Sequence, residues 1–329
     1  MGSDEMMNRV LFNPLASDLS SALSDFEEKS GLKVHSAASS ALRENRVNVN
    51  LVPSLTDHIG YLAGRLCIPS SPDDGVPEFV SIAYIVSGTQ SVIVLSQDET
   101  KSDQENLYAE LLRLVDAATS TGKLILDLLQ MVIAKVSQHI AAVEMQLLEI
   151  QRDVRLSSTL KFGPATALLL RCSGRTYPAE IEILSVGPVI AGLEEIGINL
   201  AQNSLDLIDS TGRELFGKDL EVSAREAALQ CRNLRVMSDN LMRGLRSVFS
   251  EIERHQSEIQ RKSSRLVGSV VVLLFLPLLM LNFYSQFFAE GEIWSNSWTT
   301  DLFWIGIVIV EFGVLILLRA RKWLGRRLT

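Results

Sequence analysis

The sequence predicts a membrane-anchored protein of mixed α/β (α+β) class, with a cytoplasmic N-terminal domain, a long helical stalk and a C-terminal hairpin of two transmembrane helices. Three observations support this class. Apolar residues alternate with polar ones in the first 100 residues, recur at helical spacing in the next 165, and form two long runs near the C-terminus. The 329 residues are 47% hydrophobic and 21% charged, which excludes disordered and collagen-like chains.

Charge and cysteine content narrow the class further. The formal net charge of −8 disfavours nucleic acid as a partner and makes small cations a more natural ligand. Three widely separated cysteines, Cys67, Cys172 and Cys231, are too few for a disulfide-stabilised secreted scaffold and lack CxxC metal spacing. We therefore expect free thiols in a reducing cytosol.

Residues 1–100 are expected to form the cytoplasmic α/β domain. Leu19, Leu23 and Phe26 follow Ser17 at helical spacing, so Ser17 is the predicted N-cap of a first helix. The predicted strands are 47–51, ended by Pro53, then 59–68, and a hairpin of 78–86 with 91–95.

Residues 101–265 are expected to be helical. Ser102 and Glu105 have capping-box spacing ahead of a long apolar periodicity that Gly122 is expected to kink. Glycine and proline residues in 156–178, and again Gly187–Pro188, predict breaks between separate helices.

The last part of this region is a heptad pattern that begins at Leu234 and reaches Leu266. No glycine or proline after Gly244 interrupts it before the apolar run that follows. The pattern predicts one helix of more than 40 residues that continues into the first transmembrane segment, and a helix of that length needs partners along its length.

Two apolar runs predict the transmembrane hairpin. Residues 266–288 contain no Asp, Glu, Lys or Arg, and 302–318 contain only Glu311. Each is long enough to cross a hydrocarbon layer of about 30 Å. The connecting loop 289–301 is acidic, whereas basic residues precede the first run and fill the tail 319–329, so both termini are expected on the cytoplasmic side. The N-terminal residues lack an apolar signal segment.

The C-terminal sixty residues resemble those of the CorA-type divalent cation transporters. The resemblance rests on Phe-Leu-Pro-Leu at 275–278, the short acidic loop and the closing Lys-Trp-Leu at 322–324, together with the overall layout. It implies a funnel-shaped homopentamer in the cytoplasmic (inner) membrane, in which the first transmembrane helices line a pore and the second form an outer ring. It also implies divalent cations of the Mg²⁺, Co²⁺, Ni²⁺ or Zn²⁺ class as substrate or regulator, membrane lipids as partners, and no permanently bound cofactor.

The family's Gly-Met-Asn signature is missing. Alignment on residues 275–278 places Gln286, Phe287 and Phe288 at its position, and Asn282 lies deeper in the segment. Gln286 is the preferred candidate for offering amide oxygens to a hydrated cation. The alternative is that both polar residues only hydrogen-bond between helices, and that the protein is a non-conducting, membrane-anchored sensor or regulatory assembly.

The predicted pore surface is mostly apolar. The residues expected to line it are Ser269, Val272, Leu276, Leu279, Phe283 and Gln286. Such a surface either gates a passage by dewetting or packs in a closed bundle. Glu290 and Glu292 in the loop are expected to attract cations at the outer mouth. At the inner end, Lys262 and Arg265 are expected to extend outward to lipid phosphates.

Other candidate sites are carboxylates. Glu311 lies at mid-membrane depth, where a protonated, structural role paired with the carbonyl that Pro277 frees is preferred over ion coordination. Asp73, Asp74, Asp206 and Asp209 are weak candidates for a regulatory divalent-ion site, since most such pairs are solvated surfaces. No combination of nucleophile, base and orienting residue is recognisable, so an enzyme is not expected.

Overall fold

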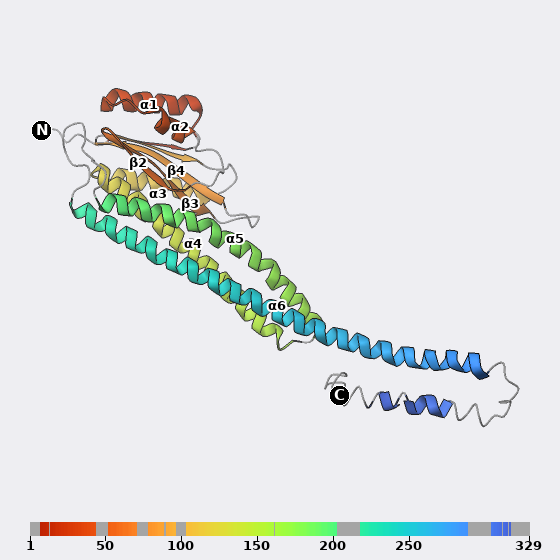
Figure 1. The fold of residues 1–329 in the computed structure, drawn as a ribbon. Coiled ribbons are helices and arrows are strands. Elements are labelled where there is room, and N and C mark those ends of the chain that lie inside the picture. Colours follow the sequence, from red (N-terminus) through yellow and green to blue (C-terminus); the bar gives the residue numbers. More distant parts are fainter. Residues whose placement is uncertain are drawn as a thin grey trace. The chain divides into compact units, whose positions relative to one another are not determined.

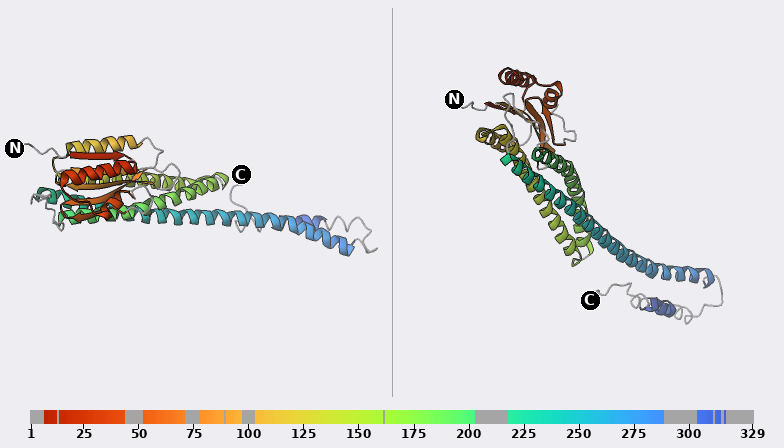
Figure 2. Two further views of the ribbon diagram at one scale, coloured as in Figure 1. Left: turned by 90° about the horizontal axis from the view of Figure 1, so that it is seen from above. Right: turned by 60° about the vertical axis from the view of Figure 1, so that its left-hand side comes forward.

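The structure is a computed structural model that describes residues 7–12, 14–43, 52–70, 78–88, 90–96, 103–160, 162–202, 218–288, 304–310, 312–314 and 316. The chain divides into two compact units (Figure 1 and Figure 2). Unit 1 comprises Met1–Arg155 and Arg171–Phe249, and unit 2 comprises Leu156–Leu170 and Ser250–Thr329.

Unit 1 contains a five-stranded sheet. Its strands are β1 (Met7–Phe12), β2 (Ser54–His58), β3 (Tyr61–Ser70), β4 (Glu78–Ser87) and β5 (Gln90–Ser96), in the order β1-β5-β4-β3-β2. β1 is parallel to β5 and the other neighbours are antiparallel. The predicted hairpin is confirmed as β4 and β5, with Val86 opposite Ser91.

The other predicted strands agree with the structure only in part. The strand predicted at 59–68 begins only at Tyr61, because Ile59 and Gly60 form the turn from β2 and Gly60 has a φ of +88°. The strand predicted at 47–51 lies outside the described residues. Strands β1 and β2 were not predicted, because neither has a clear alternation of apolar and polar side chains.

The sheet is buried on both faces, which explains the nearly continuous apolar runs of β3, β4 and β5. Helices α1 (Ala16–Ser30) and α2 (Ser36–Arg43) cover one face, where Phe26 and Leu42 pack in a core with Ile85 and Val94. On the opposite face Tyr84 is also buried. Figure 1 shows the helical layer that includes α4 and α5 on that side of the sheet.

The first helix begins two residues earlier than predicted. Leu15 is its N-cap, and the Leu15 backbone N–H donates to an Asp18 carboxylate oxygen at 3.2 Å. Ser17 therefore lies inside the first turn, and its assignment as the N-cap was wrong. The Asp18 carboxylate in the first turn stabilises the start of the helix as a cap would, because it accepts a hydrogen bond from a main-chain N–H and lies near the positive end of the helix dipole.

Three helices follow the sheet: α3 (Asp103–Ala117), α4 (Thr121–Ser157) and α5 (Phe162–Ala201). The expected irregularity near Gly122 is a break between α3 and α4 at 118–120. Thr121 anchors the start of α4 to the sheet, because its hydroxyl donates to the Ser87 carbonyl at 2.6 Å.

Helix α5 corrects the sequence analysis. Only 158–161 separate α4 from α5, and α5 then continues for 40 residues with Pro178 and Pro188 inside it. The break predicted within 156–178 is therefore confirmed between Ser157 and Phe162, whereas the breaks predicted at Gly174, Pro178 and Gly187–Pro188 were wrong. Each proline removes one helical hydrogen bond, but the buried side chains on both sides of it, among them Ala179, Val189 and Leu193, hold the helix in place.

The predicted long helix is confirmed. Helix α6 runs for 71 residues, Lys218–Phe288, and ends where the first apolar run ends. Its buried side chains in unit 1 follow the heptad pattern: Leu234, Ser238, Leu241, Leu245 and Val248. The helix therefore joins the packed core of unit 1 to the apolar part of unit 2 without a main-chain break.

One close approach in unit 1 gives a stability prediction. A Cβ atom on Gly192 of α5 would lie 2.7 Å from the Pro53 carbonyl oxygen, whereas one on Gly174 of the same helix would meet nothing within 4 Å. We expect Gly192→Ala to lower the free energy of unfolding by about 1–3 kcal/mol through overpacking against backbone. Gly174→Ala should change it by less than about 1 kcal/mol, in the stabilising direction. Thermal unfolding of the purified variants measures both, and equal melting temperatures would contradict the close packing.

Candidate functional site

Two described helices are long and apolar enough to cross a membrane, and their burial separates them. In the most apolar 18-residue stretch of α4, 56% of the stretch is buried inside the protein, so α4 is a core helix of unit 1. In α6 the corresponding window is only 6% buried. A shorter apolar helix, Trp304–Val314, follows in unit 2. The C-terminal part of α6 and this second helix are the two apolar segments that the sequence predicted.

The end of α6 places the predicted pore residues on one side of a helix. At 100° per residue, the backbone positions of Ser269, Val272, Leu276, Leu279, Phe283 and Gln286 fall within an arc of about 100° over roughly 26 Å of helix. The position of Phe287 falls at the edge of the same arc. The positions of Asn282 and Phe288 lie outside it.

Burial distinguishes the described residues of this face. Ser269 is 1% exposed, and its hydroxyl donates to the Arg265 carbonyl at 2.8 Å, which satisfies it inside an apolar segment. Val272 and Leu279 are 39% and 51% exposed. Within one copy of the chain, Ser269 is therefore already covered, and Val272 and Leu279 remain available to line a passage between copies.

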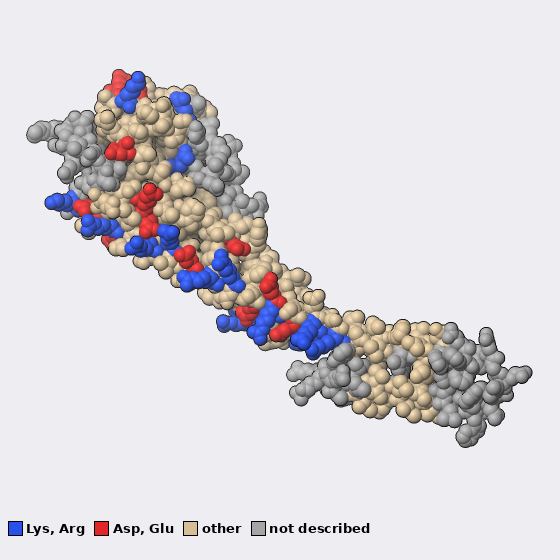
Figure 3. Space-filling model, viewed as in Figure 1, with Lys and Arg blue, Asp and Glu red and all other residues tan. Residues whose placement is uncertain are grey.

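The remaining surface of this segment suits a lipid environment. Val267, Val271, Leu274, Phe275 and Leu278 are all more than half exposed. Figure 3 shows that the charged side chains along α6 stop before this segment. In water such a continuous apolar surface would cause aggregation, whereas in a bilayer it is solvated by acyl chains.

Charged side chains are concentrated just before the apolar segment. Arg254 lies 3.7 Å from the Glu258 carboxylate, one helical turn on, and Arg261, Lys262 and Arg265 are exposed. Exposed basic side chains at this point agree with contact to lipid phosphates, which stays a prediction.

Several predicted site residues lie outside the described part of the chain. Glu290, Glu292, Glu311, Asp73, Asp74, Asp206 and Asp209 lie outside the described residues, as do the side chains of Leu276, Phe283, Gln286, Phe287 and Phe288. Among the described residues, no group of three or more His, Cys, Asp or Glu side chains could hold a metal ion. Glu194 is engaged by two arginines, with Arg232 Nε at 3.6 Å and an Arg235 terminal nitrogen at 3.5 Å.

Comparisons with known proteins establish the fold. No family model and no curated protein matches the sequence. Among solved structures, the CorA magnesium transporter from Methanocaldococcus jannaschii matches with a TM-score of 0.70 at 11% identity, over 98% of this chain and 93% of that one. The full-length CmaX protein matches with a TM-score of 0.64 at 14% identity, over 94% and 87%. The cytoplasmic domain of ZntB from Vibrio parahaemolyticus matches with a TM-score of 0.50 at 14% identity, over 71% and 83%.

The chain therefore has the fold of the CorA-type transporters: a mixed sheet with covering helices, a very long helix, and two apolar helices at the C-terminus. The resemblance seen in the sequence is confirmed for the fold. The likeness extends over nearly the whole chain, although about nine in ten aligned residues differ.

A buried polar pair in unit 1 was missed by the sequence analysis. His139 on α4 and Glu182 on α5 are 10% and 6% exposed, and His139 Nε2 lies 3.9 Å from a Glu182 carboxylate oxygen. This distance is too long for a hydrogen bond, and His139 Nε2 has no hydrogen-bond partner. Burial lowers the pKa of His139 and raises the pKa of Glu182, so the interior favours the neutral form of both.

The pair predicts a pH dependence of stability. Because the pKa of folded His139 lies below its ordinary value of 6.5, the unfolded chain binds more protons there, and stability should fall as the pH decreases through about 6.5. Glu182 acts oppositely, since its raised pKa favours the folded state as the pH falls toward 4.5.

Replacement of His139 isolates the contribution of this side chain to the pH dependence of stability. We expect His139→Leu to lose less melting temperature than the wild type between pH 7.5 and 5.5, measured by thermal unfolding at both pH values. His58, whose pKa is also lowered, is unchanged in both proteins and cancels in the comparison. Identical losses would show that His139 does not titrate differently on folding.

Proposed function

We propose that this protein is a membrane transporter of divalent metal cations that works as a homo-oligomer. The observation that carries the proposal is the uncharged, outward-facing apolar end of α6, continuous with a folded domain, in a chain that shares its fold over 98% of its length with a magnesium transporter. We further propose that the assembly is a pentamer, and that the substrate belongs to the Mg²⁺, Co²⁺, Ni²⁺ or Zn²⁺ class.

The ion path lies between the first transmembrane helices of the copies. In this arrangement the exposed Val272 and Leu279 face the axis and form an apolar constriction, which closes by dewetting and opens when the helices move apart. Amide oxygens of Gln286 contact the hydrated ion at the outer end. They take the place of the missing Gly-Met-Asn signature.

Electrostatics drives entry from outside. Glu290 and Glu292 in each copy concentrate cations at the outer mouth, because several like carboxylates around one axis focus a negative potential. With both termini cytoplasmic in the inner membrane, an inside-negative potential then favours entry of a divalent ion by about 4.6 kcal/mol per 100 mV. Lys262 and Arg265 turn outward to lipid phosphates and leave the inner mouth open to cations.

Two further assignments concern carboxylates. Glu311 is protonated and structural, and it hydrogen-bonds to the main chain beside Pro277. Asp73, Asp74, Asp206 and Asp209 bind divalent cations from the cytoplasm and bias the open and closed states. No permanently bound cofactor and no enzymatic activity are part of the proposal.

A second candidate function is a non-conducting assembly that senses or regulates from the membrane. The observation that favours it is the absence of Gly-Met-Asn, where Gln286, Phe287 and Phe288 stand instead. A bulky Phe287 side chain at the edge of the pore face would obstruct a hydrated ion.

Ion flux into liposomes decides between the two. Purified protein in vesicles that contain a metal-sensitive dye should give saturable entry of Mg²⁺, Zn²⁺, Co²⁺ or Ni²⁺ that increases with an inside-negative potential. Absence of entry for all four ions, at high and at zero internal metal, would leave only the sensor.

The same flux assay tests whether Gln286 contacts the ion. Gln286→Ala should reduce entry about tenfold through loss of hydrogen bonds to a charged, hydrated ion. Asn282→Ala is the matched control, because its position lies off the pore face. Glu311→Gln should retain both assembly and flux, and loss of flux from intact oligomers would instead give Glu311 a role in conduction.

A further inference from the structure

The last charged turn of α6 carries three basic side chains. Arg261, Lys262 and Arg265 are exposed, and Leu266, the first residue of the apolar run, follows directly. At 100° per residue, their backbone positions fall within an arc of about 100° and a rise of about 6 Å. We define these three residues as the basic turn of α6. Figure 3 shows Lys and Arg side chains gathered where the charged part of α6 meets its apolar end.

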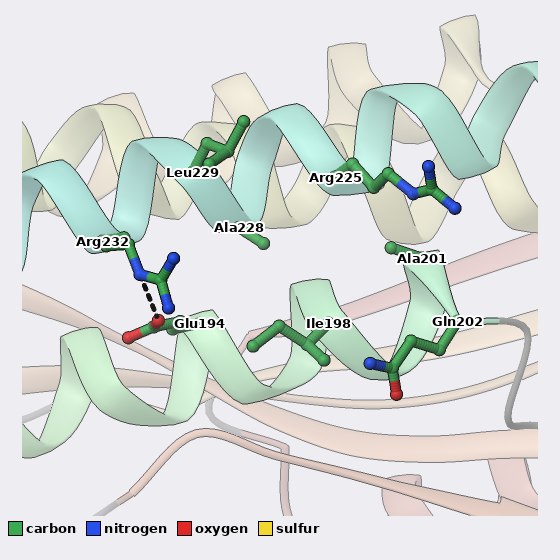
Figure 4. A pocket seen from close by; sticks show the side chains of 8 residues that line it. All are labelled: Glu194, Ile198, Ala201, Gln202, Arg225, Ala228, Leu229 and Arg232. Carbon is green, nitrogen blue, oxygen red and sulfur yellow. Dashed lines mark ion pairs between the residues drawn. The ribbon is translucent and has the colours of Figure 1, made fainter.

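Several arginines farther up α6 are engaged by carboxylates of the same chain. A terminal nitrogen of Arg225 lies 2.8 Å from a carboxylate oxygen of Glu221, one turn back on the same helix. Figure 4 shows Arg232 directed at Glu194 of α5, and Arg232 Nε lies 3.6 Å from a Glu194 oxygen. The charge of these arginines is therefore compensated within the chain.

The basic turn has no such compensation from its neighbours in the sequence. The last carboxylate before it, that of Glu258, lies 3.7 Å from Arg254 Nε. No Asp or Glu occurs in 259–289. Within the part of the chain that the structure describes, none of the ion pairs involves the basic turn. Its positive charge is therefore available to a partner.

The charge of the chain changes sign at the apolar runs. Residues 1–258 contain 35 acidic and 23 basic residues, a net charge of −12. The tail 319–329 contains five basic and no acidic residues. With both termini cytoplasmic, as in the proposed function, the basic turn and the tail lie at the same surface of the membrane. An otherwise acidic protein then presents a positive surface to the inner leaflet.

We propose that the basic turn binds the phosphate groups of anionic phospholipids, such as phosphatidylglycerol or cardiolipin, in preference to zwitterionic lipids. Two features select a lipid as the partner. Leu266, Val267 and Val271 are more than half exposed directly beyond the site and can contact the acyl chains of the same lipid molecule. A cluster of basic residues beside a membrane segment is also attracted to the net charge of an anionic leaflet, which a zwitterionic headgroup does not provide.

The axis between copies is the alternative place for these side chains. Arg265 and Val272 are seven residues apart, so their backbone positions lie on the same side of α6. Around an axis, guanidinium groups from several copies would repel one another in an apolar passage. At the membrane surface each meets an opposite charge, and the long stems of Arg and Lys let the charged ends reach around the helix. The inference rests on the lipid contact in the proposed function and names the lipid.

The test measures lipid binding to the full-length protein in detergent by native mass spectrometry, during titration with phosphatidylglycerol or phosphatidylcholine. The wild type should bind phosphatidylglycerol at least about tenfold more tightly. The double variant Arg261→Gln/Arg265→Gln should lose most of this preference. Arg243→Gln/Arg246→Gln is the matched control, because both arginines are exposed on α6 but lie at least about 20 Å from the basic turn along the helix.

Two further measurements separate the alternatives. Arg261→Lys/Arg265→Lys keeps the charge and should keep most of the preference, whereas its loss there would show that charge is not the cause. Inorganic phosphate at the same concentration should not displace phosphatidylglycerol, because it has no acyl chains to contact the apolar run.

Three results would refute the inference: equal affinity of the wild type for the two lipids, an equal loss of preference in the control variant, or displacement of the lipid by inorganic phosphate. Lipid binding is measured without ion flux. A protein that prefers anionic lipid but transports no ion would therefore refute the transport proposal alone.

Discussion

The structure depends on one continuous run of main-chain hydrogen bonds in α6, from Lys218 to Phe288. A bilayer offers no partner to unsatisfied N–H and C=O groups, so a chain that enters it must already be helical. Here the same helix is packed in unit 1 through side chains such as Leu234, Leu241 and Val248. Burial in a folded core fixes the helix at one end, and internal hydrogen bonding lets the other end be almost wholly apolar.

The side-chain chemistry changes along α6, so that successive stretches of the helix suit different surroundings. Up to about Phe249 it has a buried stripe and an exposed side that carries most of its charged residues, which fits packing against its own chain. Arg254 to Arg265 form an exposed basic segment before the apolar end of the helix. Beyond Leu266 the helix offers Val272 and Leu279 on one side and lipid-compatible residues on the other. The proposed transport of divalent cations requires these stretches to be parts of one continuous helix, because a movement of the folded domain is then transmitted to the apolar constriction.

Strong periodicity made part of this fold predictable. The β4–β5 hairpin and α6 followed from alternation and from the heptad pattern, because both are local in sequence. Strands β1 and β2 lie at the edges of the sheet and have weak patterns. Pro178 and Pro188 misled the analysis of α5, because packing on both sides of each proline outweighed local preference. The His139–Glu182 pair joins two helices, and no pattern within either one indicates it. For the candidate pore, helix register could be read from the sequence, whereas the burial of Ser269 depended on tertiary packing.

Amide hydrogen exchange along α6 in the detergent-solubilised or nanodisc-bound protein tests the central claim most directly. The segment 250–266 joins the core of unit 1 to the apolar end of the helix. An uninterrupted helix predicts slower exchange than in an unfolded chain for every amide from Ile252 to Leu266, with less protection than in the packed stretch 234–248. Rapid exchange confined to 250–266 would reveal a hinge or an unfolded linker, and the folded domain and the membrane segment would then not share one helix.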